Sequence, residues 1–288
     1  MRQNKKCPAC QVENFKIFVK MDECKKISFK EYDRKYYEGF LTKISSDIDM
    51  KLLKCNNCKH IFWYEIPSKK KISLMYEEHA RLKLKKKSKF TNSYNDEFKK
   101  KTIHEMIKIF PQGKTFCDYG AGACEWAEFA SKYFKVTAYD KYLSRMNDSN
   151  NFEIENRPDT LINKKFDFIF INQVFEHIDF HNESLSLISK ICHKNSIVYI
   201  NVPNVGRENM TKLANEWPYN GKESHLMAPF QHLHGFTQKS LNILMNKNGF
   251  KELSLKENYY VSKIYFFRKL LGYIFPFFSS TRFIGRKK

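Results

Sequence analysis

The sequence TFCDYGAGACEWAEFASKYFKVTAYD (residues 115–140) decides the fold of this chain. It begins with a short apolar run that ends in Asp118, and a tight turn with Gly120 and Gly122 follows. Apolar side chains then recur on one face of a helix, and a second apolar run ends in Asp140. The order strand, glycine turn, helix, strand and acid is that of the first half of a nucleotide-binding α/β domain.

The two glycines of this turn have a specific physical role. Gly120 and Gly122 can adopt backbone angles that side chains disfavour, and they let the main chain approach a ligand closely. The helix that begins near Ala123 directs free N–H groups toward the same ligand, and Asp140 is placed to bind a ribose diol. A dinucleotide fingerprint requires a third glycine at the position of Glu125, so the pattern disfavours NAD.

The turn resembles motif I of the class I S-adenosylmethionine (SAM)-dependent methyltransferases, in which an acid is followed by three glycines at alternate positions. Residues 118–124 read DYGAGAC, so only the last glycine is replaced, by Cys124. Downstream, residues 166–172 (FDFIFIN) have the continuous apolar pattern of a buried central strand. They lead into QVFEHI, which is similar to a segment common in one large group of these enzymes.

Later motifs keep the order of that family. An amphipathic helix over 183–192, a strand over 196–204 and the sequence HLHGFT at 232–237 are followed by a further helix and Gly249-Phe250. The resemblance covers roughly 110–250, and it implies an α/β fold with a Rossmann-like, seven-stranded and mostly parallel sheet. It therefore predicts an enzyme, a class I SAM-dependent methyltransferase.

The resemblance also implies roles for individual residues, beyond the backbone approach at the two turn glycines. Asp118 is expected near the methionine end of SAM, where a carboxylate favours the ammonium and sulfonium charges. Asp140 is expected to bind the ribose hydroxyls. The end of the strand over the FDFIFIN sequence is expected to bring Asn172 and Gln173 beside the sulfonium and the acceptor, and Asn156 is a candidate contact for the adenine.

The amino-terminal part contains two C-x-x-C sequences, Cys7-Pro8-Ala9-Cys10 and Cys55-Asn56-Asn57-Cys58. Each can present two thiolates on a tight turn, and four thiolates satisfy tetrahedral zinc without an open position for water. The doubled sequence favours a structural zinc ion over two unrelated pairs, and neither pair has the strand–helix context of a redox site. Their long separation implies an inserted hairpin or loop. This part resembles the small zinc module that precedes many methyltransferase domains in sugar and surface-glycan pathways.

The remaining cysteines give no indication of a nucleophile. Cys117 and Cys192 lie in apolar patterns, Cys124 lies in the glycine turn, and the fourth is Cys24. The amino terminus has no apolar run typical of a signal peptide. Together with reduced cysteines, this predicts a cytoplasmic protein.

Basic residues dominate the charge, which sums to a formal +20 over 288 residues. Much of it lies in 69–71, 81–89 and 99–101, in a lysine-rich linker. A nucleic-acid partner would suit such a charge, yet a composition rich in lysine and poor in glycine and proline accounts for it without one. The chain lacks the D/N-P-P-Y/F motif of amino-group base methyltransferases and the Pro-Cys nucleophile of cytosine enzymes. Nucleic acid is therefore unsupported, whereas anionic substrates such as nucleotide sugars suit a positive surface.

Methylation of a sugar hydroxyl calls for a group that removes its proton, and histidine commonly does so. The candidates are His177, His225, His232 and His234, of which His232 is the better base and His177 lines the site, although a single histidine is more often structural. Related zinc-bearing sugar C-methyltransferases have a His-Glu-His triplet where this chain has Phe230-Gln231-His232. The first histidine and the acid are missing, which favours O-methylation over C-methylation.

Residues 264–280 (IYFFRKLLGYIFPFFSS) are strongly aromatic. Arg268, Lys269 and Pro276 interrupt them, and the stretch is shorter than the ~20 apolar residues that a membrane span needs. Two interpretations stay open. We favour an insertion packed on the fold before a last strand at 282–286, and the second is an amphipathic helix at a membrane surface, near a lipid-linked glycan.

The sequence as a whole predicts a zinc-binding module at 1–66, a basic helical linker at 67–100 and a methyltransferase domain at 101–288. The predicted reaction is SAM-dependent O-methylation of a sugar hydroxyl in a nucleotide-linked or lipid-linked glycan, an acceptor class that rests on family resemblance alone. The predicted location is the cytoplasm, with peripheral contact at the inner membrane face as an addition. Two alternatives stay open: a nonenzymatic SAM-binding protein whose zinc module binds a partner, and an RNA methyltransferase.

Overall fold

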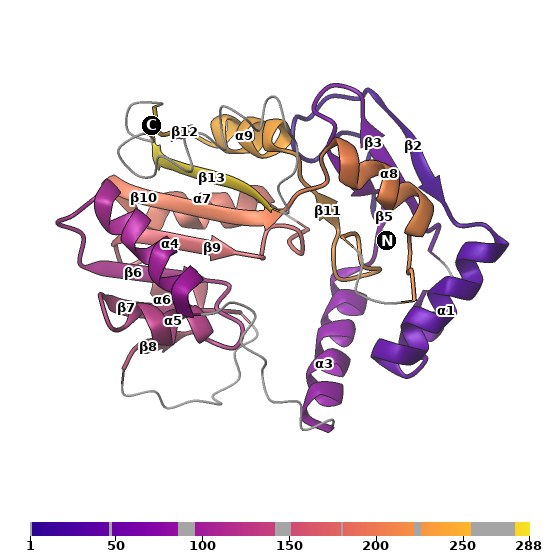
Figure 1. The fold of residues 1–288 in the computed structure, drawn as a ribbon, viewed down its shortest axis with the longest axis horizontal. Helices are drawn as coiled ribbons and strands as arrows, with labels where there is room; N and C mark the ends of the chain where they lie inside the picture. The colour runs from indigo at the N-terminus through magenta and orange to yellow at the C-terminus, as the bar shows by residue number, and fades with distance from the viewer. Residues whose placement is uncertain are drawn as a thin grey trace. The chain divides into compact units, whose positions relative to one another are not determined.

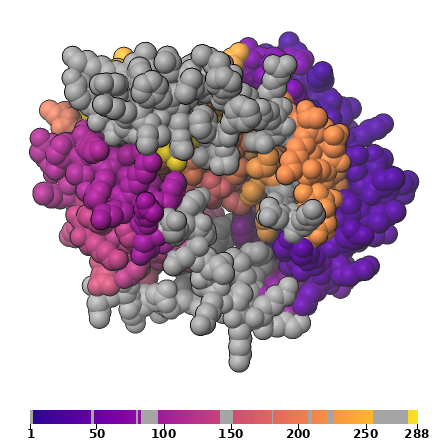
Figure 2. Space-filling model, viewed as in Figure 1, coloured from indigo at the N-terminus to yellow at the C-terminus, as the bar shows by residue number. Residues whose placement is uncertain are grey.

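A computed structural model describes residues 2–45, 48–85, 96–141, 151–179, 181–221, 226–254 and 280–288 (Figure 1; the same residues are coloured in the space-filling view of Figure 2). The chain divides into two compact units, and each has its own hydrophobic core. The first unit comprises 1–89, 176–179 and 203–243, and the second comprises 90–175, 180–202 and 244–288.

The second unit is built on a seven-stranded sheet with the order β12-β13-β10-β9-β6-β7-β8. Strands β10, β9, β6, β7 and β8 are parallel to their neighbours in this series, and β12 pairs antiparallel with β13. This confirms the predicted Rossmann-like, mostly parallel sheet. The strands are β6 (Thr115–Tyr119), β7 (Lys135–Tyr139), β8 (Glu153–Glu155), β9 (Phe166–Asn172), β10 (Cys192–Pro203), β12 (Phe250–Glu252) and β13 (Ser280–Lys287).

Both faces of this sheet are covered, which explains why the central strands read as continuous apolar runs. Helices α4 (Asp96–Ile109) and α5 (Glu125–Ala130) cover one face, and α7 (His181–Ile191) lies on the other (Figure 1). On the first face, Trp126 of α5 packs on Phe170 of β9, with 4.5 Å between ring centroids. The short helix α6 (Pro158–Leu161) precedes β9, and α9 (Gln238–Lys247) leads from the first unit into the second.

The first unit contains a four-stranded antiparallel sheet with the order β11-β4-β3-β2 and a separate pair of strands, β1 and β5. Strand β11 comes from a distant part of the sequence, and His234 and Gly235 in it pair with Phe62 and Ile61. The strands are β1 (Arg2–Gln3), β2 (Phe15–Lys20), β3 (Lys51–Cys55), β4 (Ile61–Trp63), β5 (Glu65–Ile66) and β11 (His234–Gly235).

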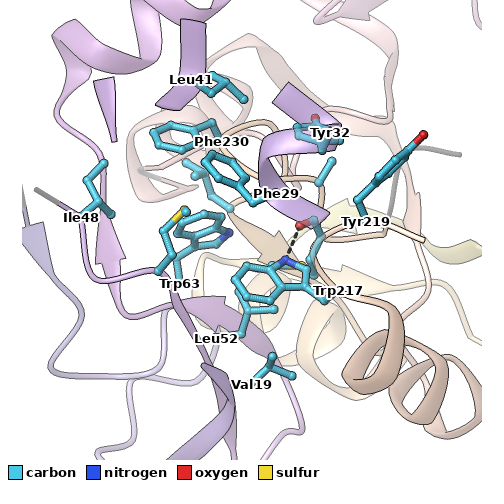
Figure 3. Close-up of a cluster of buried hydrophobic side chains, with 14 of the residues drawn as sticks. Val19, Phe29, Tyr32, Leu41, Ile48, Leu52, Trp63, Trp217, Tyr219 and Phe230 are labelled. Atoms are coloured by element: carbon cyan, nitrogen blue, oxygen red, sulfur yellow. Dashed lines mark hydrogen bonds between the residues drawn. The ribbon is translucent and has the colours of Figure 1, made fainter. Parts of the chain in front are cut away.

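Large aromatic side chains from segments 1–89 and 203–243 of the first unit contribute to its core (Figure 3). Trp63 of β4 lies 6.1 Å from Trp217 and 5.8 Å from Phe230, centroid to centroid. The Trp217 indole N–H donates to the carbonyl of Met227 at 2.9 Å, so the polar edge of this buried ring is satisfied. Residues 203–243 therefore share a core with the amino-terminal strands. The boundaries drawn from the sequence at 66 and 100 stay a prediction.

The helices of the first unit are α1 (Glu23–Tyr37), α2 (Phe40–Ile44), α3 (Lys69–Lys85) and α8 (Arg207–Glu216). Between the C-x-x-C sequences, where the sequence predicts an inserted hairpin or loop, β2 and β3 pair antiparallel, and two helices, α1 and α2, connect them. The buried carboxylate of Asp33 holds the two helices together, because it accepts the backbone N–H groups of Leu41 and Thr42 at 2.8 and 2.7 Å. Helix α3 lies within the predicted basic linker.

Two predictions concern the carboxyl-terminal part. The last strand expected at 282–286 is present as β13. The aromatic stretch at 264–280 lies, except for its last residue, outside the described residues. Within the described part of the chain, no helix is both long and apolar enough to cross a membrane.

Candidate functional site

The four cysteines of the C-x-x-C sequences come together in the first unit. Cys7, Cys10, Cys55 and Cys58 are all buried, and their sulfur atoms lie within 4.8 Å of one another. The Sγ atoms of Cys7 and Cys58 are 3.6 Å apart, and those of Cys10 and Cys55 are 3.5 Å apart. A tetrahedral ion with metal–sulfur bonds of about 2.3 Å would set sulfur atoms about 3.8 Å apart, so the cluster has the dimensions of a zinc site.

The two C-x-x-C turns have the same backbone structure. The carbonyl of Cys7 accepts the N–H of Gln11 at 2.8 Å, and the carbonyl of Cys55 accepts the N–H of Lys59 at 3.0 Å. Gln11 and Lys59 both have a φ of 62°, in the left-handed region. Each turn thus folds back over its own pair of sulfur atoms, as expected for a zinc knuckle.

In the second unit, the glycine turn connects β6 to α5. The backbone N–H groups of Gly120 and Ala121 both donate to the carbonyl of Tyr139, at 2.7 and 3.0 Å, which ties the turn to the end of β7. Gly120 and Gly122 have φ values of +81° and +51°. The N–H of Gly122 donates to a carboxylate oxygen of Asp140 at 3.0 Å, so the turn and the acid after β7 face each other.

The two glycines have different surroundings. A Cβ at Gly120 would lie 2.5 Å from the Cγ2 of Val174, so this glycine is required for packing inside the second unit. A Cβ at Gly122 would meet no described atom within 4 Å, and this glycine is exposed. Backbone approach to a ligand is therefore available at Gly122, whereas Gly120 allows Val174 to pack.

Asp118, near the end of β6, has a buried carboxyl group that is only 3% exposed. Its Oδ2 atom has no hydrogen-bond partner among the described residues. Burial raises the pKa of this carboxyl to about 7, against a hydrogen bond from the N–H of Ala127 that lowers it. A cationic group of a ligand beside Asp118 would stabilise its ionised form.

Asn172 and Gln173 lie at the carboxyl end of β9, the neighbour of β6 in the sheet. The side-chain oxygen of Asn172 accepts the amide of Asn201 at 2.8 Å, and the backbone N–H of Gln173 donates to the carbonyl of Asn201. Gln173 has a φ of 56°, so the chain turns sharply here. Asn201 on β10 therefore fixes this edge, a role that the sequence did not indicate.

A second group of polar side chains lies in the first unit. Ligand atoms of Glu176, His177 and His232 lie within 4.8 Å of one another, and the two imidazole rings are 4.7 Å apart, centroid to centroid. The indole N–H of Trp63 donates to the carbonyl of His232 at 3.0 Å and positions its backbone. Burial raises the pKa of Glu176 to about 8 and lowers the pKa of His232. The two histidines predicted as catalytic are thus brought together, with an acid that the sequence had not singled out.

The other two histidine candidates lie outside this group or outside the described residues. His234 is buried in β11 and its Nδ1 lies 3.2 Å from the Nε2 of His60, in a stacked pair of imidazole rings. It therefore belongs to the packing of the small sheet. His225 lies outside the described residues.

A family model described as "Methyltransferase domain" matches residues 91–255, more than half of the chain. The chain belongs to this methyltransferase family. This assignment confirms the predicted enzyme class. No curated protein sequence matches the methyltransferase.

The methyltransferase is also similar to solved structures. One is the 1,6-didemethyltoxoflavin-N1-methyltransferase of Burkholderia thailandensis with bound 1,6-didemethyltoxoflavin and S-adenosylhomocysteine, at 13% identity and a TM-score of 0.50, covering 81% of this chain and 97% of that chain. A SAM-dependent methyltransferase from Archaeoglobus fulgidus is 17% identical, with a TM-score of 0.46 and coverages of 75% and 99%. At this identity the first similarity shows the fold alone, which is that of class I SAM-dependent methyltransferases.

The residues of the second unit fit the cofactor of such a fold. The open space above Gly122 admits a ligand, Asp140 presents a carboxylate beside the turn, and the buried oxygen of Asp118 lacks a partner among the residues described. A ligand with a diol and a cationic group satisfies both acids, and SAM carries both. The sequence identified these three residues, because all of them lie in the short segment 115–140, but it missed Val174, whose packing depends on Gly120.

Proposed function

We propose that this methyltransferase transfers a methyl group from SAM to a hydroxyl of a sugar, in a nucleotide-linked or lipid-linked glycan. The observation that supports SAM most directly is the contact between the N–H of Gly122 and the carboxylate of Asp140, because the acid lies beside the open part of the turn. The sugar acceptor is supported by the four-cysteine module, which resembles the zinc modules of glycan-modifying methyltransferases.

In this proposal the second unit holds the cofactor. Asp140 binds the ribose hydroxyls, Gly122 allows close approach of the backbone, and Asp118 lies near the ammonium group. Asn172 and Gln173 lie at the end of β9, where ligands of such sheets bind. Gly120 contributes indirectly, because it keeps Val174 packed beneath the turn.

When bound, SAM supplies a methyl carbon attached to a positively charged sulfur, so the acceptor chiefly needs alignment and loss of its proton. His232 is the proposed base. The Nδ1–H of His232 donates to the carbonyl of Leu226 at 2.7 Å, which leaves the Nε2 lone pair to accept a proton. Burial lowers the pKa of His232, so the imidazole is neutral at pH 7 and competent as a base. His177 lies beside it in the same group.

Zinc at the four cysteines would be structural, because four thiolates leave no open coordination position. The site lies at the end of β3, and an ion there would fix the strands of the small sheet, which share a core with residues 203–243. Peripheral contact with a membrane face remains part of the proposal for a lipid-linked acceptor, and it depends on residues 264–280.

The first experiment is calorimetric titration of the zinc-loaded protein with SAM, with NADH as the comparison ligand. We expect one SAM per chain, no heat with NADH, and affinity for SAM at least tenfold weaker in Asp140→Ala, because charge-assisted hydrogen bonds are worth about 1.5–3 kcal/mol. Asp159→Ala, an exposed acid on α6, is the control and should bind normally. Failure of the folded protein to bind SAM would overturn the proposal.

The acceptor is tested separately, with methyl-labelled SAM and a panel of nucleotide sugars, lipid-linked saccharides and RNA. Label transfer to a sugar oxygen, lost in His232→Ala with SAM binding unchanged, is the expected result. Label in RNA alone would replace the sugar acceptor by the RNA alternative. Full activity in His232→Ala would remove the base from the proposal while leaving the cofactor in place.

A further inference from the structure

Glu176, His177 and His232 form a compact donor set, which we call the two-histidine group. We propose that this group binds a divalent transition-metal cation such as Mn²⁺, with open positions for oxygen atoms of the acceptor. The cation would be additional to any zinc at the four cysteines. All three residues belong to the first unit, and His232 comes from a part of the chain far from the other two.

The distances suit a single ion. The Nε2 of His177 lies 3.8 Å from a carboxylate oxygen of Glu176, and all three ligand atoms lie within 4.8 Å of one another. Two atoms that are each about 2.1 Å from a common ion can be at most about 4.2 Å apart. The group is therefore within a fraction of an ångström of a coordinating arrangement, which a small side-chain rotation would close.

Hydrogen bonds on the far side of both rings direct the correct nitrogen atoms into the group. The Nδ1 of His177 lies 2.8 Å from the carbonyl of Gln231, and the Nδ1 of His232 lies 2.7 Å from the carbonyl of Leu226. A carbonyl can only accept, so each Nδ1 carries the proton and each Nε2 presents a lone pair. Imidazoles that bind metals are held in this way, by a backbone carbonyl or carboxylate on the other nitrogen.

Glu176 gives a second and independent indication. Glu176 is 1% exposed, and within the described part of the chain neither carboxylate oxygen has a hydrogen-bond partner beyond its own backbone. Its backbone is fixed, since its carbonyl accepts the N–H groups of Leu233 and His234 at 2.7 and 3.1 Å. Burying a carboxyl group without partners costs free energy. A cation bound by the Nε2 atoms of the two histidines would offset that cost by interacting with the carboxylate of Glu176.

The donor chemistry selects the kind of ion. Two imidazole nitrogens and one carboxylate suit Mn²⁺, Fe²⁺, Co²⁺ or Zn²⁺ better than Mg²⁺ or Ca²⁺, which prefer oxygen ligands alone. Three protein ligands leave positions open, and the side chain of His177 is 27% exposed, so oxygen atoms from outside can reach the ion. The vicinal hydroxyls of a sugar would supply such atoms.

The metal site does not depend on the proposed function, whereas a role for the cation in catalysis does. A hydroxyl bound to the cation loses its proton more readily, because the cation stabilises the alkoxide. In that case His232 is a metal ligand and the proton leaves to solvent. Loss of activity in His232→Ala is expected for either role, so the two are separated by metal binding and not by activity.

The test is a titration with Mn²⁺ of the full chain loaded with one equivalent of zinc, which the four thiolates take up, and free Mn²⁺ is followed by electron paramagnetic resonance. Thiolates select zinc over Mn²⁺, so the four-cysteine cluster does not compete. We expect one Mn²⁺ per chain, with at least tenfold weaker binding in Glu176→Gln and in His232→Ala. His104→Asn, which removes an exposed histidine on α4, is the control and should bind like the unaltered protein.

Zinc content and SAM binding of each variant show whether its two units have folded. If the folded protein takes up no Mn²⁺, or if both variants bind it as well as the His104→Asn control, the metal site is wrong. That result would leave SAM binding intact, and so it is distinguishable from failure of the proposed function. Failure to bind SAM with normal Mn²⁺ uptake would show the reverse.

Discussion

Gly120 and Gly122 lie in the same turn with positive φ, yet one serves the fold and the other faces open space. A side chain at Gly120 would collide with Val174 at 2.5 Å. We therefore expect Gly120→Ala to lower the free energy of unfolding by about 2–3 kcal/mol, and Gly122→Ala by about 1 kcal/mol, the cost of a left-handed alanine. Urea unfolding monitored by circular dichroism measures both.

Gly122 also predicts an effect on ligand binding. Gly122→Ala should weaken SAM binding at least tenfold in a folded protein, because the new methyl group occupies the open space above the turn. Val174→Ala combined with Gly120→Ala is the matched control, and it should regain part of the lost stability. Equal stability losses in the two single variants would contradict the assignment of Gly120 to packing.

Asp118 predicts a pH dependence of stability. Burial raises the pKa of its carboxyl from 3.8 to about 7, so between these values the folded state holds a proton that the unfolded state has lost. The contribution of Asp118 to stability is complete below the unfolded pKa, and it is lost as the pH rises through the folded one, by at most about 4 kcal/mol. Between about pH 4 and about pH 7, the unfolding free energy should fall less steeply with pH in Asp118→Asn than in the unaltered protein. An unchanged slope would contradict the burial of an ionisable Asp118; the buried Glu176 adds its own slope equally to both proteins.

The two cysteine turns join strands β3 and β4 to the amino-terminal segment, and they predict a metal dependence of the small sheet. We expect one zinc ion per chain and none in Cys55→Ser, with loss of ordered structure in the first unit, because binding a structural ion contributes directly to folding. Cys24→Ser removes an exposed cysteine outside the cluster and should keep its zinc. Metal analysis after dialysis decides the outcome, and zinc retained by Cys55→Ser would contradict it.

The sequence predicts elements whose residues form a continuous apolar or periodic pattern. It does not predict elements that form by pairing with residues far away in the sequence. Strand β9 was expected at 166–172 and has those bounds, because a run of buried apolar residues is a local signal. The two residues of β11 lie in the HLHGFT sequence that resembles a methyltransferase motif, and no periodicity in two residues indicates that they pair with β4. The helices α1 and α2 likewise depend on the buried Asp33, whose partners lie eight and nine residues away.

The candidate site follows the same division. The cofactor turn is contiguous in sequence, so its acids and glycines could be named in advance. Glu176 was part of a recognised motif, but its significance depends on burial and on His232, which lies in a different segment of the chain. A single sequence does not report burial of a charged residue, and it does not report which nitrogen of a histidine is held by a carbonyl.

At the scale of the whole molecule, the described residues include one large hydrophobic cluster in each unit, and these two cores share no residue. The unit of each core carries a different proposed ligand site. Zinc and SAM are therefore expected to stabilise different segments. At one hundred times its dissociation constant, SAM should add about 2.7 kcal/mol to the protection of the unit that contains β6 and β7. Chelation of zinc should instead raise hydrogen exchange in β3 and β4. Peptide-resolved hydrogen–deuterium exchange measures both effects in one sample series, with the Asp140→Ala and Cys55→Ser variants as matched controls. If SAM and chelator altered exchange in the same peptides, the two cores would unfold as one cooperative unit, and the separate roles assigned to them would be wrong.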